Sequence, residues 1–123
     1  MQVRSESGAC PDECPLDQCL QLLAGAWTHQ VIWYLRDGAL RFGDLRRSLP
    51  GVSAKVLTTR LRELELRGVL SRRVLPSSPP AVEYELTPLG RDLLPVLESI
   101  ASVGKRLRAR ERRTVVARTR SSR

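Results

Sequence analysis

The chain has 123 residues, which suffice for one domain with one modest hydrophobic core, and a formal net charge of +8 at pH 7. Its longest apolar run, residues 22–27, is far shorter than the roughly 20 apolar residues that a membrane-spanning helix needs. The polar N-terminus does not resemble a signal peptide. These features argue against a membrane protein, and we expect a cytoplasmic one.

The positive charge is concentrated in two segments. Residues 36–73 hold ten Lys or Arg against four acids, and residues 104–123 hold nine against one, which gives net charges of +6 and +8. Residues 1–35 and 74–103 each hold one Arg against four acids. Such segregation is typical of a protein with a nucleic-acid-binding face. For the C-terminal segment alone, a solvated charged surface is an equally good interpretation.

The N-terminal part predicts a flexible arm and two helices. Residues 1–13 show no period and predict the arm. Cys14 and Pro15 suit the N-cap and the first position of a helix, and residues 27–36 predict a second helix that Asp37 and Gly38 end. The apolar face of the first helix consists of Leu16, either Cys19 or Leu20, and Leu23. The residues of the second helix that we expect to be buried are Trp27, Val31 or Ile32, Tyr34 and Leu35.

Residues 53–67 predict a helix with one apolar and one polar face. Ser53 suits the N-cap, and Gly68 follows at the expected stop position. The apolar face consists of Leu57, Leu61 and Leu64, which recur at i, i+4 and i+7. The opposite face carries Lys55, Thr58, Thr59 and Arg62. These side chains suit contacts with phosphates and base edges.

The residues before this helix predict a second helix that pairs with it. Residues 42–49 predict a short helix that ends at a Pro50–Gly51 turn. Two helices joined by so tight a turn predict a helix-turn-helix, with residues 53–67 as the reader helix. Arg46 and Arg47 lie on the supporting helix, where we expect them to contact phosphate. Ordinary helical hairpins share the same spacing, so this stretch alone leaves both interpretations open.

Residues 69–86 predict a β-hairpin. Two strand-like runs flank a loop, residues 76–80, that is rich in Pro and Ser. A helix-turn-helix followed at once by a hairpin predicts a winged helix. Arg72 and Arg73 open this wing and are further candidates for DNA contact, although in one register Arg73 faces Glu83 across the hairpin.

Residues 88–110 predict a long helix, capped by Thr87 and Pro88, and the Arg-rich residues 111–123 predict a disordered tail. The long helix has an apolar stripe that includes Leu93, Leu97 and Ile100. Together with the apolar face of the first helix, this stripe is most simply buried against a second copy of the chain. The alternative is that the helix folds back onto its own domain.

The cysteines predict a possible sensor and no metal site. A zinc site normally has four ligands, and only one histidine, His29, is available to complete Cys10, Cys14 and Cys19, so we expect no metal. The N–H groups at a helix N-terminus favour a thiolate at Cys14, whereas the acidic residues around it disfavour one. Redox sensing by Cys14, paired with Cys10 or with the partner subunit, therefore stands as a hypothesis beside an inert thiol. We expect Cys19 to lie in the core.

The sequence gives little evidence for catalysis or for a small-molecule site. With one histidine, no Gly-rich phosphate loop and no G-x-S-x-G motif, the sequence argues against an enzyme and predicts no cofactor. The aromatic residues Trp27, Trp33 and Tyr34 could line a pocket for a small molecule, although aromatic residues in a small domain are usually core.

Residues 14–104 resemble the HxlR-type regulators, winged helix-turn-helix proteins related to the MarR group. The segments that carry the resemblance are CPLDQCLQLLAGAWTHQVIWYL, FGDLRRSLPGVSAKVLTTRLRELELRGVLSRRV and VEYELTPLGRDLLPVLESI. The resemblance implies a homodimeric bacterial transcription factor that pairs through its first and last helices and binds a pseudo-palindromic operator. It also implies that Cys14 occupies the position of the cysteine through which some members sense oxidants or electrophiles. Ala26, His29, Gln30 and the Arg-rich tail depart from the family pattern.

We therefore predict a mainly α-helical fold with a small β-hairpin wing, an α+β winged helix-turn-helix with N- and C-terminal dimerisation helices. The predicted function is that of a dimeric, sequence-specific DNA-binding regulator, most simply a repressor that responds to an oxidant or a small molecule. The alternatives are a non-specific nucleic-acid binder driven by the basic tail and a protein-binding module on the same scaffold. The predicted DNA-binding residues are Arg46, Arg47, Ser53, Lys55, Thr58, Thr59, Arg62, Arg72 and Arg73.

Overall fold

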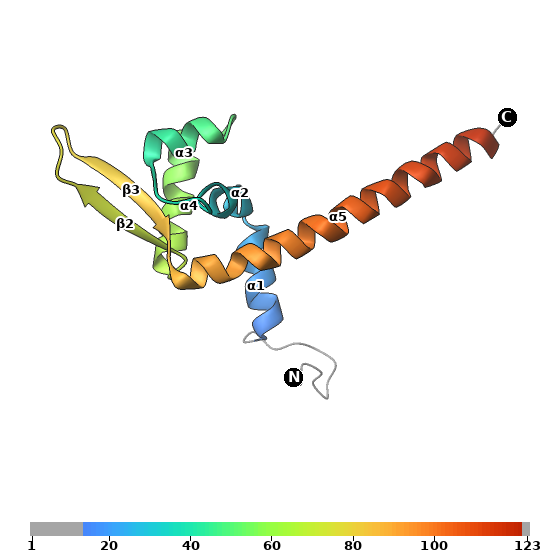
Figure 1. The fold of residues 1–123 in the computed structure, drawn as a ribbon, viewed down its shortest axis with the longest axis horizontal. Helices are drawn as coiled ribbons and strands as arrows, with labels where there is room; N and C mark the ends of the chain where they lie inside the picture. Colours follow the sequence, from blue (N-terminus) through green and yellow to red (C-terminus); the bar gives the residue numbers. More distant parts are fainter. Residues whose placement is uncertain (1–13, 122–123) are drawn as a thin grey trace.

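The computed structural model describes residues 14–121, and their side chains up to residue 116. Helices dominate, and a small sheet projects from one side of the domain (Figure 1). The elements in chain order are α1 (Pro15–Ala24), α2 (Thr28–Tyr34), β1 (Leu40–Arg41), α3 (Phe42–Ser48), α4 (Ala54–Leu66), β2 (Leu70–Leu75), β3 (Ala81–Leu86) and α5 (Pro88–Ser121). The predicted fold class, a winged helix-turn-helix, is confirmed.

The hydrophobic core lies between α2, α3, α4 and the base of the wing. Its centre is formed by side chains that are at most 2% exposed, namely Val31, Ile32, Leu35, Leu45, Leu49, Leu57, Leu61, Leu64, Val69 and Leu70. The predicted apolar face of α4 is therefore confirmed. The prediction for Tyr34 is wrong, because 43% of this residue is exposed. At about 100° per residue, the buried positions of α2 share one face, and Tyr34 falls outside it.

The sheet has three antiparallel strands in the order β1-β3-β2. The hairpin of β2 and β3 is the predicted wing, and its register places Arg73 opposite Glu83 and Arg72 opposite Tyr84. The short strand β1 adds to the other edge of β3 and pairs Leu40 with Tyr84. Because Tyr84, Leu86 and Leu70 are buried, one face of the hairpin base is fixed against the domain.

The base of the wing is joined to the start of α5 by Thr87. Its backbone N–H donates to the carbonyl oxygen of Val69 (3.0 Å), and its hydroxyl donates to the carbonyl oxygen of Gly68 (2.5 Å). The same hydroxyl accepts a hydrogen bond from the backbone N–H of Gly90 (3.1 Å), which caps α5 as the sequence predicts. A Cβ at Gly90 would overlap the carbonyl oxygen of Val69, so only glycine fits this close approach.

The last helix is longer than predicted. α5 continues to Ser121, so the expectation of a disordered tail is wrong for residues 111–121. Residues 105–121 contain neither Gly nor Pro and are rich in Arg, a good helix former, which explains why the helix continues without an apolar period. With 34 residues α5 is about 51 Å long, and its C-terminal half projects away from the domain (Figure 1). Even so, in the described part of the chain no helix combines the length and apolar character needed to cross a membrane.

Candidate nucleic-acid interface

The predicted reader helix α4 is fixed at its start and along one side. The Ser53 hydroxyl accepts a hydrogen bond from the backbone N–H of Val56 (3.1 Å), as expected for an N-cap. The buried leucine face fixes the rotation of the helix about its axis. Consequently Lys55, Thr59 and Arg62 are exposed on the opposite face, with Thr58 half-buried beside them.

Two buried apolar side chains anchor the turn between α3 and α4 to the core. Leu49 and Val52 are 2% and 5% exposed, and the backbone N–H of Val52 donates to the carbonyl oxygen of Leu49 (3.2 Å). Gly51 takes φ 95°, in the left-handed region that favours glycine. A hydrogen-bonded turn flanked by two buried side chains fixes the angle at which α4 leaves α3, as a helix-turn-helix requires.

The arginines of α3 lie exposed in its last turn. Arg47 forms an ion pair with Asp44, one turn earlier on the same helix. For Arg46, residues 14–116 provide no ion-pair partner. Both side chains are therefore available to an anion outside the domain, although Arg47 would have to share its charge with Asp44.

The two wing arginines do not act together. Because successive side chains of a strand point to opposite faces, Arg72 and Arg73 lie on different faces of the hairpin. Arg73 donates a hydrogen bond to the carboxylate of Glu83 (2.6 Å), so the two residues face each other in the register that the sequence offered. This hydrogen bond and the negative charge of Glu83 raise the pKa of the Arg73 guanidinium. Arg72 is exposed, and the described side chains include no ion-pair partner for it.

Sequence reasoning missed a residue that positions the reader helix, Arg60. Its Nε donates to the carbonyl oxygen of Ala26 (2.7 Å), and the same guanidinium pairs with Glu63. Its side chain is only 20% exposed. The contact ties α4 to the junction between α1 and α2, where Trp27 takes a left-handed backbone conformation with φ 67°. No local pattern could have found it, because the acceptor is a backbone oxygen 34 positions away.

The cysteines separate into different environments. Cys14 is the N-cap residue of α1, as predicted, and only 3% of it is exposed. Cys10 lies outside the described residues. Cys19 is half-buried against the core, as expected. The described residues include no group of three or more His, Cys, Asp or Glu side chains that could hold a metal ion.

The six residues predicted to form a dimer interface have different degrees of exposure. Leu16, Leu20 and Ile100 are 56%, 51% and 51% exposed. Leu23 and Leu97 are half-buried against the core of their own chain. Leu93 is only 7% exposed and belongs to that core, so its assignment to an interface is wrong. The start of α5 thus partly folds back onto its own domain, which was the alternative interpretation.

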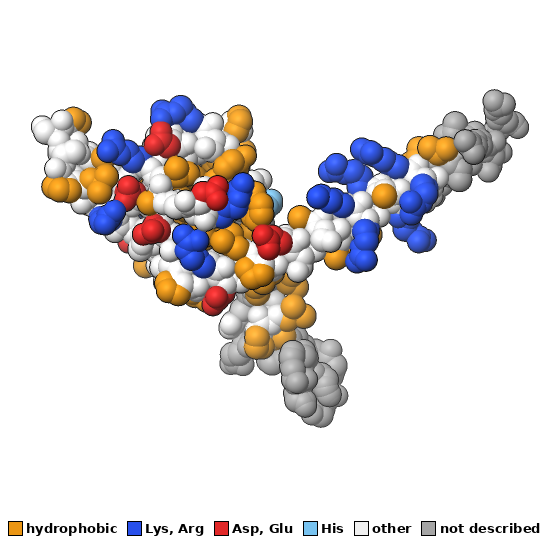
Figure 2. Space-filling model, viewed as in Figure 1, with side chains coloured by type: hydrophobic (Ala, Val, Ile, Leu, Met, Phe, Trp, Pro, Cys, Tyr) orange, Lys and Arg blue, Asp and Glu red, His pale blue; other side chains and the backbone are white. Residues whose placement is uncertain are grey.

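The apolar surface continues beyond the predicted residues. Further along α5, the exposed apolar side chains are Val96, Val103 and Leu107. In Figure 2 apolar side chains gather along α1 and where α1 meets α5, whereas Lys and Arg surround the projecting half of α5.

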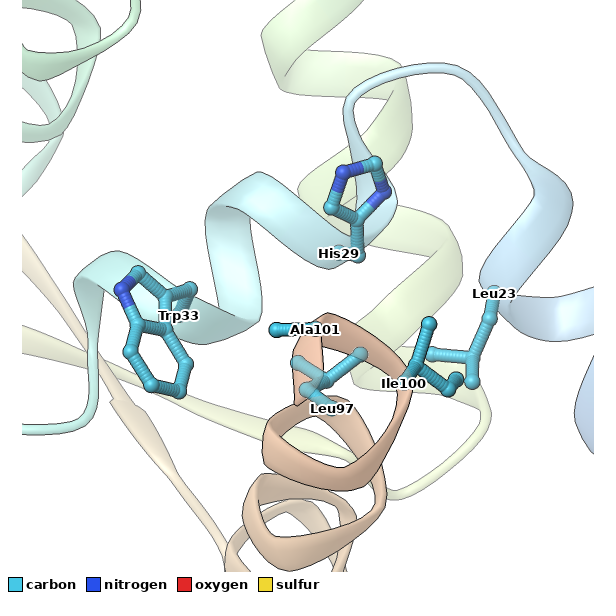
Figure 3. A pocket seen from close by; sticks show the side chains of 6 residues that line it. All are labelled: Leu23, His29, Trp33, Leu97, Ile100 and Ala101. Atoms are coloured by element: carbon cyan, nitrogen blue, oxygen red, sulfur yellow. The ribbon is translucent and has the colours of Figure 1, made fainter. Parts of the chain in front are cut away.

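A cavity of about 430 Å³ opens where α1, α2 and α5 meet. Figure 3 shows His29 of α2 above the side chains of α5, Trp33 of α2 to their left and Leu23 of α1 to their right. The lining residues are Leu23, His29, Trp33, Leu97, Ile100 and Ala101. Of the three aromatic residues considered for a pocket, only Trp33 lines this one. The guanidinium of Arg36 lies over the Trp33 ring, 4.4 Å from its centroid, and helps to hold it in place.

Comparison with known proteins agrees with this architecture. The sequence pattern of the HxlR-like helix-turn-helix family matches residues 22–118. An HTH-type transcriptional regulator from Synechocystis sp. is 44% identical over 91 residues, which are 74% of this chain and 67% of that protein. The structure of a MarR-family transcriptional regulator from Porphyromonas gingivalis W83 is 38% identical, with a TM-score of 0.74 over 79% of this chain and 95% of that one. The reduced form of the redox regulator HypR is 36% identical, with a TM-score of 0.72 over 76% of this chain and 93% of that one.

The family match covers most of the chain, including the helix-turn-helix, the wing and most of α5. The matched residues include α4 and the elements on which its buried leucine face packs, which leaves the polar face of α4 exposed. This chain therefore belongs to the HxlR-like helix-turn-helix family and is a DNA-binding transcriptional regulator.

Proposed function

We propose that the protein is a homodimer that binds a pseudo-palindromic operator in the bacterial cytoplasm and represses transcription there. The observation that carries this proposal is the exposed polar face of α4, opposite three buried leucines and behind a hydrogen-bonded N-cap. Such a helix fits the major groove, where its side chains reach base edges. Repression requires only that the operator is occupied.

The residues divide between reading sequence and fixing position. Lys55 and Arg62 donate to guanine O6 and N7, and the Thr58 and Thr59 methyl groups pack on thymine or their hydroxyls contact phosphate. Arg46, Arg47 and the hydroxyl of Ser53 contact phosphates and fix the register of α4 in the groove. From the wing, Arg72 is better placed than Arg73 to bind phosphate, because Glu83 already neutralises Arg73.

A second copy of the chain covers the exposed apolar side chains of α1 and α5. Leu16 and Leu20 on α1 and Ile100 on α5 are each half exposed or more, which is costly in a monomer. Two-fold pairing through these helices places two reader helices on one side of the dimer. The operator is then expected to have half-sites about one helical turn, roughly 34–36 Å, apart.

An effector acts on the pairing of the two copies. The cavity shares Leu23, Leu97 and Ile100 with the proposed interface, so its occupation by an apolar molecule would change how the copies pack. A redox signal would act instead at Cys14, at the start of α1, through a change in its thiol–disulfide state. HypR, a relative of known structure, is a redox regulator and supports this second possibility. Either signal would alter the spacing of the reader helices.

Selection of bound fragments from genomic DNA, with and without diamide, tests the proposal. We expect a palindrome to be enriched under reducing conditions, and a Cys14→Ser variant to retain binding after diamide if this cysteine is the sensor. Cys19→Ser is the matched control, because Cys19 packs against the core. If no sequence is enriched under either condition, the protein is a non-specific binder or a protein-binding module.

A further inference from the structure

The C-terminal half of α5 carries a basic surface that the reader helix and the wing do not use. Six Lys or Arg residues and one acid, Glu111, occupy positions 105–113. All of these residues are exposed, and among the described side chains none forms an ion pair with them. These like charges repel one another, which raises the free energy of the unbound protein, and an anionic partner would relieve the repulsion.

Five of the six basic side chains lie on the side of α5 that faces away from its apolar stripe, whereas Arg110 lies beside the stripe. At about 100° per residue, Lys105, Arg106, Arg108, Arg112 and Arg113 fall within an arc of roughly 160°. Four exposed apolar residues of the same helix lie about opposite the centre of the arc, namely Val96, Ile100, Val103 and Leu107, whereas Val115 and Val116, further along the helix, do not. A second copy seated on the apolar stripe would therefore leave the basic surface uncovered.

We propose that this basic surface, residues 105–113 of α5, binds the phosphate backbone of duplex DNA outside the segment read by α4. Residues 105–113 span about 12 Å of helix axis. A duplex carries one negative charge per roughly 1.7 Å, so about seven phosphate charges lie along the same length. The inference rests on the proposed function and adds to it a contact without sequence preference.

The basic surface lies well beyond the part of α5 that packs on the domain. Leu97 is the last residue of α5 that packs on the core, and residue 109 lies about 18 Å further along the helix axis. Once α4 has bound, the basic surface meets the same duplex at an effective concentration far above that of free DNA. A contact that is weak alone then adds affinity.

A membrane surface fits the same segment less well. Helices that lie in a membrane interface need a broad apolar face, usually with aromatic residues. Within residues 105–113 the apolar side chains are Leu107 and Ala109, and neither is aromatic. The apolar stripe also ends at Leu107, where the densest positive charge begins.

The test compares two variants that change the same four exposed arginines. One carries Arg106→Gln, Arg108→Gln, Arg112→Gln and Arg113→Gln, and the other carries Lys at these positions. Both residue types are good helix formers, so far-UV circular dichroism should match the wild type. Binding to a selected operator and to a scrambled duplex of equal length is measured by fluorescence anisotropy between 50 and 200 mM salt.

The salt dependence distinguishes the outcomes. Each lost phosphate contact makes the slope of log K against log salt shallower by about 0.9, so the dimeric Gln variant should lose at least about 1.8 on both duplexes. The Lys variant should keep the wild-type slope, and the operator preference should stay unchanged in both. A Gln variant with the wild-type slope, or a Lys variant that behaves like Gln, would overturn the proposal.

Two further measurements distinguish a failure of this proposal from a failure of the proposed function. Vesicles of phosphatidylcholine and phosphatidylserine serve as a membrane probe. Vesicle binding that the Gln variant loses, with an unchanged DNA slope, would overturn the proposal in favour of lipid. Equal binding of the wild type to operator and scrambled duplex would contradict the proposed sequence-specific function, whereas the slope difference between variants would still decide the role of α5.

Discussion

The same substitution at two positions of α5 should have opposite effects on stability. Gly90 lies in the first turn, where an added Cβ would overlap the carbonyl oxygen of Val69 and approach the Cδ2 and Cβ atoms of Leu86 to 3.1 and 3.3 Å. Gly104 lies in the projecting half, where no atom comes within 4 Å of an added Cβ. Gly104→Ala is therefore the matched control for Gly90→Ala.

The magnitude follows from two opposing terms. Within a helix, Ala is more favourable than Gly by about 0.8–1.0 kcal/mol, and Gly104→Ala should stabilise α5 by that amount. Gly90→Ala gains a similar amount but overpacks the junction between the wing and α5, which costs about 1–3 kcal/mol. The upper end applies because the obstructing atom is a backbone oxygen, which cannot rotate away. We expect a net loss of about 2 kcal/mol.

Urea unfolding followed by circular dichroism measures both variants at one fixed protein concentration, because the stability of a dimer depends on concentration. We expect Gly90→Ala to lower the midpoint without changing the slope. We expect Gly104→Ala to leave the midpoint unchanged or raise it, with more helical signal. A Gly90→Ala protein as stable as the wild type would refute the close approach of α5 to Val69.

The remaining predictions concern the reader helix and its supports. Lys55→Ala and Arg62→Ala should each weaken operator binding by about 1–3 kcal/mol in an anisotropy titration, whereas Arg67→Ala, at the C-cap of the same helix and outside the reader face, should not change the operator preference. Arg60→Ala should weaken operator binding without abolishing folding, because α4 loses its hydrogen bond to the α1–α2 junction; unchanged binding would remove Arg60 from the account. Ile100→Asp should convert the proposed dimer to a monomer in analytical ultracentrifugation, and a dimer that survives would place the interface elsewhere.

Local signals in the sequence were sufficient to predict the winged helix-turn-helix. Leu57, Leu61 and Leu64 recur at helical spacing, and their burial confirms the face that α4 turns towards the core. Ser53 has a side-chain oxygen that suits an N-cap, and it accepts the expected hydrogen bond. Thr87 likewise caps α5. Periodicity and capping depend on nearby residues, which is why the sequence predicts them well.

Features that depend on distant or absent partners could not be predicted in the same way. An apolar stripe does not say which surface covers it, so Leu93 was assigned to an interface although its own core buries it. Nothing in the sequence distinguishes Arg60 from an exposed arginine of a helix, because its acceptor is a backbone oxygen in the distant α1–α2 junction. The helix beyond residue 110 was missed because its residues favour a helix by propensity, without the apolar period that marks a packed one.

The most direct test of sequence-specific binding by α4 is the ratio of two dissociation constants. The wild-type protein is titrated with a selected operator duplex and with a scrambled duplex of the same length and composition, at 150 mM salt. We expect a ratio of about 10³ or more in favour of the operator, with most of it lost when Lys55 and Arg62 are both replaced by Ala. A ratio near one, or a high ratio that survives the double substitution, would contradict sequence-specific binding by α4.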